Sequence, residues 1–271
     1  MIRIFYLCFL FLFFLNWDLW AQNWVVSSYP LSKICQELFP EERLYFLSPP
    51  KGEFHFSEPT FKDWEAIKRA ELIILVGSEP WAKKVHNMVP KEKIIALASL
   101  GERLPDPHLW FDFNRIEKFI QTLVNHPTVK AKPYYKKANE RADNFLKKLS
   151  FLQKEYASLS QCKEKEFYTL GHQVFYYLFK DLGIKENSLV KGHHHGEISL
   201  KRLKEVLTVA KKRGVKKILL TEKEFVRYKD IFLREGFQVF EAWPGDYDLP
   251  GSYLQLMERN LEVFKNLLNC F

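Results

Sequence analysis

One uninterrupted helical segment near the middle of this 271-residue chain constrains its fold more than any other feature. Between residues 134 and 159 neither glycine nor proline occurs, and apolar side chains recur at the spacing of an α-helix. This apolar stripe consists of Tyr134, Ala138, Ala142, Phe145, Leu149 and Leu152. Helices in globular proteins average ~10–14 residues, so the segment is too long for an ordinary crossover helix. We expect a helix at residues 133–160 that links two lobes.

Short apolar strands alternate with helical segments on both sides of this helix. On its N-terminal side, strands are expected at residues 24–28, 43–47, 72–76 and 94–97, and helices from residue 31, at 61–70 and at 114–124. On its C-terminal side, strands are expected at 167–170, 217–221 and 237–242, and helices at 172–182, 200–212 and 253–268. Such alternation is typical of parallel sheets covered by helices. We predict an α/β protein of two doubly wound lobes, residues 22–132 and 161–271, joined by one long backbone helix.

The first 21 residues have the composition of a secretory signal peptide. Arg3 supplies a positive charge, residues 5–15 are almost wholly apolar, and the small residue Ala21 ends the segment. The apolar run is shorter than the ~20 residues that a membrane-spanning helix needs. We therefore expect residues 1–21 to be a signal peptide and the protein to be extracytoplasmic, in the periplasm.

The cysteines and the charge distribution fit an exported globular protein. An oxidising compartment permits disulfides, and Cys162 and Cys270, which flank the C-terminal lobe, are the expected pair, with Cys35 as a buried thiol. The net charge is +8, but lysine and arginine are interspersed with acidic residues. Because no basic block is interleaved with aromatic residues, the sequence does not favour a nucleic-acid partner.

Three of the eight histidines lie between an expected strand and the element that follows it. His55 follows the second strand, His108 the fourth, and His172 the first strand of the C-terminal lobe. Ligands of open α/β sheets bind beyond the carboxyl ends of strands, and neutral imidazole is a common ligand of zinc. The three positions together predict a metal site in the cleft between the lobes.

Three sequence motifs around these histidines and a fourth near the C-terminus carry a resemblance to a known family. The motifs are His55-Phe56-Ser57-Glu58-Pro59-Thr60, Asp106-Pro107-His108-Leu109-Trp110, His172-Gln173-Val174-Phe175 and Tyr253-Leu254-Gln255-Leu256-Met257. In this order, between Trp24 and Leu268, they resemble the zinc- and manganese-binding proteins of bacterial ABC importers, the zinc-uptake or TroA-like family. The resemblance implies a monomeric binding protein, not an enzyme, that captures one transition-metal ion and delivers it to an ABC permease in the membrane. It also implies that His55, His108 and His172 are metal ligands.

The motifs do not identify the residue that supplies the fourth ligand. Family members often have an aspartate two residues after the last strand, and here Ala242 stands in that position. Water is one substitute, and the protein candidates are Glu222, Glu241, Asp246 and Asp248. The loop at residues 192–197 offers accessory metal ligands: His193, His194 and His195.

The ligand types favour zinc, because imidazoles suit zinc whereas manganese prefers carboxylate oxygens. A manganese- or iron-binding member of the same family is the alternative. A secreted zinc-dependent hydrolase would use the same three imidazoles, with Glu222 or Glu241 as general base, but the sequence has no His-Glu-x-x-His motif. A binding protein for an organic ligand is a third interpretation, which the 16% aromatic content permits.

Overall fold

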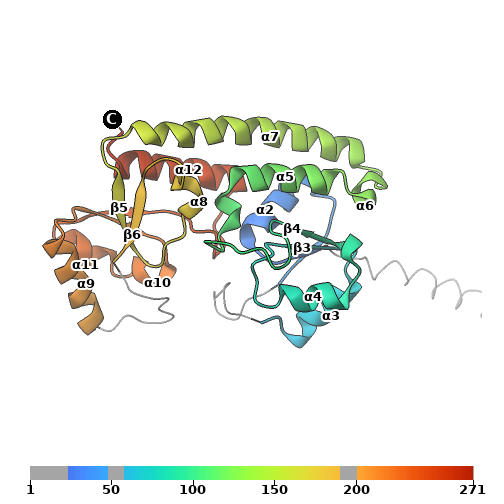
Figure 1. Cartoon of the computed structure of the whole chain (residues 1–271), viewed down its shortest axis with the longest axis horizontal. Helices are drawn as coiled ribbons and strands as arrows, with labels where there is room; N and C mark the ends of the chain where they lie inside the picture. The colour runs from blue at the N-terminus through green and yellow to red at the C-terminus, as the bar shows by residue number, and fades with distance from the viewer. Residues whose placement is uncertain (1–23, 48–57, 190–199, 271) are drawn as a thin grey trace, which may run out of the picture.

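The structure, a computed structural model, describes residues 24–47, 58–189 and 200–270. Two α/β lobes lie side by side, and the long helix α7 (Tyr135–Ser158) runs along both of them (Figure 1). The one-turn 3-10 helix η5 (Leu159–Gln161) follows it. The prediction of two lobes joined by one long helix is therefore confirmed. The proposed signal peptide lies outside the described residues.

The N-terminal lobe contains a four-stranded parallel sheet in the order β2-β1-β3-β4. Its strands are β1 (Trp24–Val26), β2 (Leu44–Phe46), β3 (Leu72–Leu75) and β4 (Ile94–Ala96). Its helices are α2 (Tyr29–Leu38), α3 (Phe61–Arg69), α4 (Ala82–Met88), η3 (Lys91–Lys93), η4 (Leu109–Phe111), α5 (Phe113–Val124) and α6 (Pro127–Lys130). All residues of β3 are buried, as expected for a parallel strand covered on both faces.

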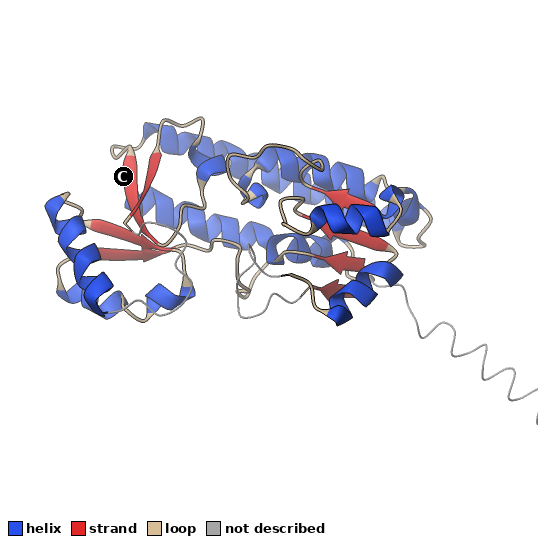
Figure 2. Cartoon of the chain, turned by 60° about the horizontal axis from the view of Figure 1, so that its bottom comes forward, coloured by secondary structure: helices blue, strands red, loops and turns tan. Residues whose placement is uncertain are grey.

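The C-terminal lobe repeats this arrangement with the strand order β6-β5-β7-β8, again all parallel. Its strands are β5 (Glu166–Leu170), β6 (Lys185–Ser188), β7 (Lys217–Leu220) and β8 (Gln238–Glu241). Its helices are α8 (Tyr176–Phe179), α9 (Leu200–Lys212), α10 (Lys223–Val226), α11 (Lys229–Arg234) and α12 (Tyr253–Leu267). Figure 2 shows the two sheets at opposite ends of the molecule.

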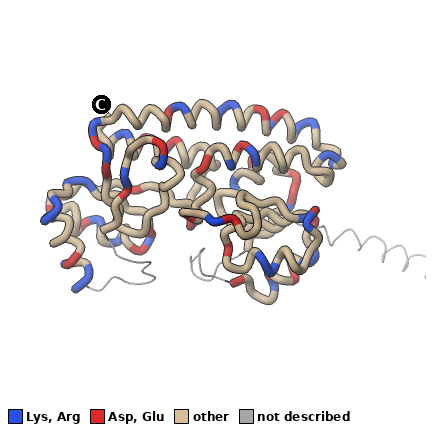
Figure 3. Tube along the Cα trace, viewed as in Figure 1, with Lys and Arg blue, Asp and Glu red and all other residues tan. Residues whose placement is uncertain are grey.

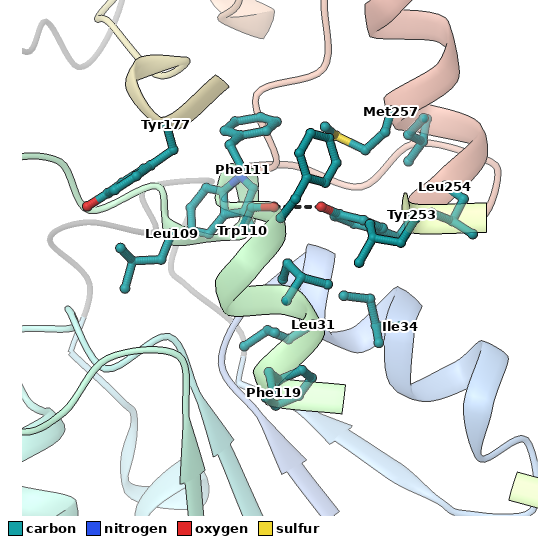
Figure 4. Packing of buried hydrophobic residues seen from close by; sticks show 14 of the residues in the cluster. Leu31, Ile34, Leu109, Trp110, Phe111, Phe119, Tyr177, Tyr253, Leu254 and Met257 are labelled. Atoms are coloured by element: carbon teal, nitrogen blue, oxygen red, sulfur yellow. Dashed lines mark hydrogen bonds between the residues drawn. The ribbon is translucent and has the colours of Figure 1, made fainter. Parts of the chain in front are cut away.

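One hydrophobic core is shared by both lobes. It joins α2, α5, α7, α8 and α12 with the inner faces of both sheets, and Figure 4 shows part of it, where Leu31 and Ile34 of α2 lie near Phe119 of α5. Two smaller cores lie on the outer sheet faces, so that along β1 Trp24 and Val26 join the shared core while Val25 joins the outer one. Because packed interiors resist shear, the shared core limits how far the lobes can move apart.

For the C-terminal lobe, one expected helix was wrong and one strand was not anticipated. No helix covers residues 172–182 as a whole: residues 172–175 form a loop and α8 is one turn long. The backbone N–H groups of Val174 and Phe175 donate to the carboxylate of Glu186 instead of opening a helix. Strand β6 was missed because its sequence, Lys-Glu-Asn-Ser, has no apolar residue; it is an edge strand and pairs only with β5 among the described strands.

Other features follow from composition. Cys162 and Cys270 form a disulfide across the end of the C-terminal lobe, and Cys35 is buried and free. Basic and acidic residues alternate along α7 rather than forming one charged face (Figure 3). Within the described ranges, no helix combines the length and the apolar character needed to cross a membrane.

Candidate metal centre

Three side chains converge between the lobes at the carboxyl ends of the strands. They are His108, His172 and Asp246, and their potential ligand atoms all lie within 4.8 Å of one another. Nε2 of His108 lies 3.1 Å from Nε2 of His172. Oδ2 of Asp246 lies 3.6 Å from Nε2 of His172 and 4.0 Å from Nε2 of His108. In the part of the chain that the structure describes, this is the one cluster of three such groups.

His108 is held by a carboxylate in its own loop. Oδ1 of Asp106 accepts from the backbone N–H of His108 at 2.8 Å and lies 2.8 Å from its Nδ1. The His108 side chain is only 1% exposed. From the other lobe, the hydroxyl of Tyr177 donates to the backbone oxygen of Asp106 at 2.9 Å. The position of His108 is therefore fixed by its own loop and by the facing lobe.

His172 is held by a carboxylate from a neighbouring strand. It follows β5 and Gly171, and Oε1 of Glu222, just after β7, accepts from its backbone N–H at 2.9 Å and lies 2.9 Å from its Nδ1. Gly171 has φ +133°, and a Cβ there would lie 2.6 Å from Oγ1 of Thr221 and 3.0 Å from Oε1 of Glu222. Burial lowers the pKa of His172, but the hydrogen bond to Glu222 and the charge of Asp246 outweigh it, so this pKa is raised.

These carboxylates decide what the two imidazoles can do. A carboxylate can only accept, so Nδ1 of each ring must be the protonated nitrogen and Nε2 carries the lone pair. The two Nε2 atoms thus face each other at hydrogen-bonding distance beside a third carboxylate, an arrangement that a shared proton or a metal cation stabilises. Tetrahedral zinc with Zn–N bonds of ~2.0–2.1 Å would hold two nitrogens about 3.3 Å apart, close to the observed 3.1 Å.

Asp246 belongs to the loop between β8 and α12. Its side chain is 13% exposed, and burial raises its pKa, whereas the charges of His108 and His172 lower it. Gly245 precedes it with φ +91°, and the indole N–H of Trp110 donates to the backbone oxygen of Pro244 at 2.9 Å. Asp246 is thus the member of the candidate set for the fourth position that the structure brings to the two histidines.

The other sequence candidates either lie outside the described residues or make contacts of another kind. His55, His193, His194 and His195 lie outside the described residues. Glu241 pairs with Lys229 on the surface, and Asp248 pairs with Lys33 and is 67% exposed. Glu222 orients His172, and Ala242 is buried with its N–H donating to Leu220. Sequence reasoning missed the orienting role of Asp106, although a carboxylate two residues before a histidine was a usable signal.

Fold and candidate site together define the class of two-lobed solute-binding proteins. The family described as zinc-uptake complex component A, periplasmic, matches residues 25–267, and the chain belongs to that family.

Relatives and solved structures agree with this assignment. The chain is 24% identical to the high-affinity zinc uptake system protein ZnuA of Bacillus subtilis, covering 90% of this chain and 86% of that protein. It is also 24% identical to the zinc-binding lipoprotein AdcA of Streptococcus pneumoniae, covering 90% of this chain but 55% of that longer protein. The Zn(II)-bound ZnuA-like domain of AdcA superimposes with a TM-score of 0.76 at 24% identity, covering 92% of this chain and 99% of that domain. This likeness establishes the fold.

Proposed function

We propose that this protein captures one zinc ion outside the cytoplasm and delivers it, as a monomer, to an ABC-type permease in the membrane. The observation that carries the proposal is the convergence of His108 Nε2, His172 Nε2 and Asp246 Oδ2 within 4.8 Å. Membership of the zinc-uptake family supports the transport role. Zinc is the expected cargo because two relatives are named for zinc binding or zinc uptake and because imidazole nitrogens suit this ion.

The proposed ligands are His108, His172, Asp246 and His55. His55 is included because it follows β2, and the carboxyl ends of parallel strands share one edge of a sheet. Asp106 and Glu222 orient the histidines and keep their Nε2 lone pairs available. This role needs no bond chemistry. A hydrolase would require a base aimed at a bound water, whereas the Oε1 atom of Glu222 already serves His172.

Metal binding by the mature, metal-free protein tests the proposal. Calorimetric and chelator-competition titrations at neutral pH should find one tight zinc site and weaker manganese binding. The variant with His55→Ala, His108→Ala and His172→Ala should lose this site. The matched control is the variant with His193→Ala, His194→Ala and His195→Ala, which should keep it.

Three outcomes would revise the proposal differently. Wild-type affinity in the first triple variant would refute the ligand set. Manganese binding as tight as zinc binding would make the protein a manganese-binding member of the family. Delivery is tested in the source cell: loss of the gene should slow growth under zinc chelation, and added zinc should restore it. Unchanged growth would argue against uptake.

A further inference from the structure

The loop that carries Asp246 lies against both lobes. We define the Asp246 loop as residues 242–251, between β8 and α12. Its first part is held by the C-terminal lobe, where the side chain of Asn260 on α12 accepts from the N–H of Trp243 at 2.8 Å and donates to its carbonyl oxygen at 2.8 Å. Further along, the indole N–H of Trp243 donates to the oxygen of Tyr247 at 2.8 Å and Arg259 of α12 donates to the oxygen of Pro250 at 3.2 Å. The loop also has contacts with residues of the N-terminal lobe.

Trp110 of the N-terminal lobe fixes the loop just before Asp246. Its indole N–H donates to the oxygen of Pro244, and a Cβ added to Gly245 would lie 2.3 Å from Nε1 of Trp110 and 3.0 Å from Cγ of Pro30. The hydroxyl of Tyr253 donates to the backbone oxygen of Trp110 at 2.7 Å, the contact drawn as a dashed line in Figure 4. Only glycine at position 245 permits the loop to approach the Trp110 ring this closely.

Lys33 of α2 fixes the loop just after Asp246. Its ammonium nitrogen lies 2.6 Å from the oxygen of Leu249, 3.1 Å from the oxygen of Gly251 and 2.8 Å from Oδ1 of Asp248. An ammonium has three hydrogens, and the Asp246 loop provides an oxygen for each of them. The Lys33 side chain is only 10% exposed. A buried cation is costly unless it is fully satisfied, so the loop is held where these oxygens meet the ammonium.

We infer that Lys33 is a positioning residue for the Asp246 carboxylate. It acts from the N-terminal lobe on a ligand that belongs to the C-terminal lobe in chain order. Without the ammonium, two loop carbonyls and the Asp248 carboxylate lose their shared partner, and residues 248–251 lose these contacts with the N-terminal lobe. Affinity for a metal depends on ligands that are already held in place. This inference rests on the proposed function, because it takes Asp246 as a metal ligand.

The test compares Lys33→Met with Lys217→Met in the full mature protein. Lys217 makes the same kind of contact, with the oxygens of Asn266 and Leu267 and Oδ1 of Asn269 at 2.5, 3.1 and 2.6 Å, but at the start of β7, the end opposite Glu222. Zinc affinity is measured by competition with a chelating indicator. We expect Lys33→Met to weaken zinc binding about tenfold, in the range usual for residues that support a ligand, and Lys217→Met to leave it unchanged.

A double-mutant cycle separates positioning of Asp246 from a general effect on the fold. In an Asp246→Ala background, Lys33→Met should cause no further loss of affinity, because the carboxylate that it positions is gone. The visible absorption maximum of bound Co²⁺ should shift in the same direction in Lys33→Met and Asp246→Ala. Thermal unfolding is followed for each variant, and Lys33→Gln replaces Lys33→Met if the latter does not fold.

Two results would overturn the inference alone: wild-type affinity in Lys33→Met while Asp246→Ala is weakened, or an equal loss from Lys33→Met in both backgrounds. Wild-type affinity in Asp246→Ala would instead refute the ligand assignment, and the inference with it.

Discussion

The two lobes share one strand order but hold their histidines differently. In the N-terminal lobe, His108 is oriented by Asp106, two residues earlier in the same loop. In the C-terminal lobe, His172 is oriented by Glu222, 50 residues later and after a different strand. The carboxylate that orients His108 is therefore local in sequence, whereas the one that orients His172 is in place only once the sheet has formed. Orientation of His172 thus depends on the C-terminal sheet, whereas the position of Asp246 depends on the packing of the two lobes.

The largest expected effect tests whether the lobes contribute equally. His108→Ala and His172→Ala should each weaken zinc binding more than ~100-fold, because loss of a ligand exceeds the ~10–100-fold cost of losing a supporting residue. Competition titration at neutral pH measures both. His126→Ala is the control, since His126 contacts the oxygen of Glu92 away from the site. Near-native affinity in either ligand variant would show that one lobe binds the ion alone.

Removal of the carboxylate ligand should have a smaller effect on zinc than on manganese. Asp246→Ala is expected to weaken zinc binding by roughly 100-fold, the upper end of the range for supporting residues, and manganese binding by more, because zinc is suited by imidazoles whereas manganese depends on oxygen donors. Parallel titrations with the two ions measure the difference. Glu241→Ala, which removes an exposed carboxylate paired with Lys229, is the control. An equal loss for both ions would contradict the assignment of Asp246 as a direct ligand.

The orienting carboxylates allow the sharpest comparison of the lobes. Asp106→Asn and Glu222→Gln keep the size of each side chain but remove its charge, and each should weaken zinc binding about tenfold. Neither should change the number of ions bound. If Glu222→Gln alone has an effect, the local turn around His108 orients its imidazole without help from the charge of Asp106.

The last expected effect concerns stability and leaves the metal aside. Burial raises the pKa of Glu186, in the C-terminal lobe, from its ordinary value of 4.5 to about 7, although Thr169, Val174 and Phe175 donate to its carboxylate. The folded protein therefore binds a proton that the unfolded chain releases, and stability is lost as pH rises between these values. This group alone contributes a slope of at most about 1.4 kcal/mol per pH unit.

Urea unfolding of the metal-free protein at pH 5, 6, 7 and 8 measures this slope. Glu186→Gln should flatten it, and Glu258→Gln, at an exposed position on α12, should not. In the N-terminal lobe, burial also raises the pKa of Glu79, which accepts from the N–H groups of Val76 and Gly77. An unchanged slope in Glu186→Gln together with a flattened one in Glu79→Gln would assign the pH dependence to the N-terminal lobe.

Most of the fold was predictable from local pattern. The strands at Leu72–Leu75 and Lys217–Leu220 and the helix at Tyr135–Ser158 follow from apolar runs and helical spacing that need no distant partner. The polar edge strand β6 and the loop at residues 172–175 were not predictable, because both depend on contacts between segments.

The candidate site was likewise predictable only where local pattern was sufficient. The sequence by itself determined that His108 and His172 follow strands and carry the family motifs. It left Asp246 as one of several carboxylates. The tertiary structure alone chose among them, because Trp110 and Lys33, distant in sequence, hold the Asp246 loop against the N-terminal lobe. Local patterns report which side chains are buried, whereas the position of a carboxylate at a metal depends on long-range hydrogen bonds that form only when the lobes pack together.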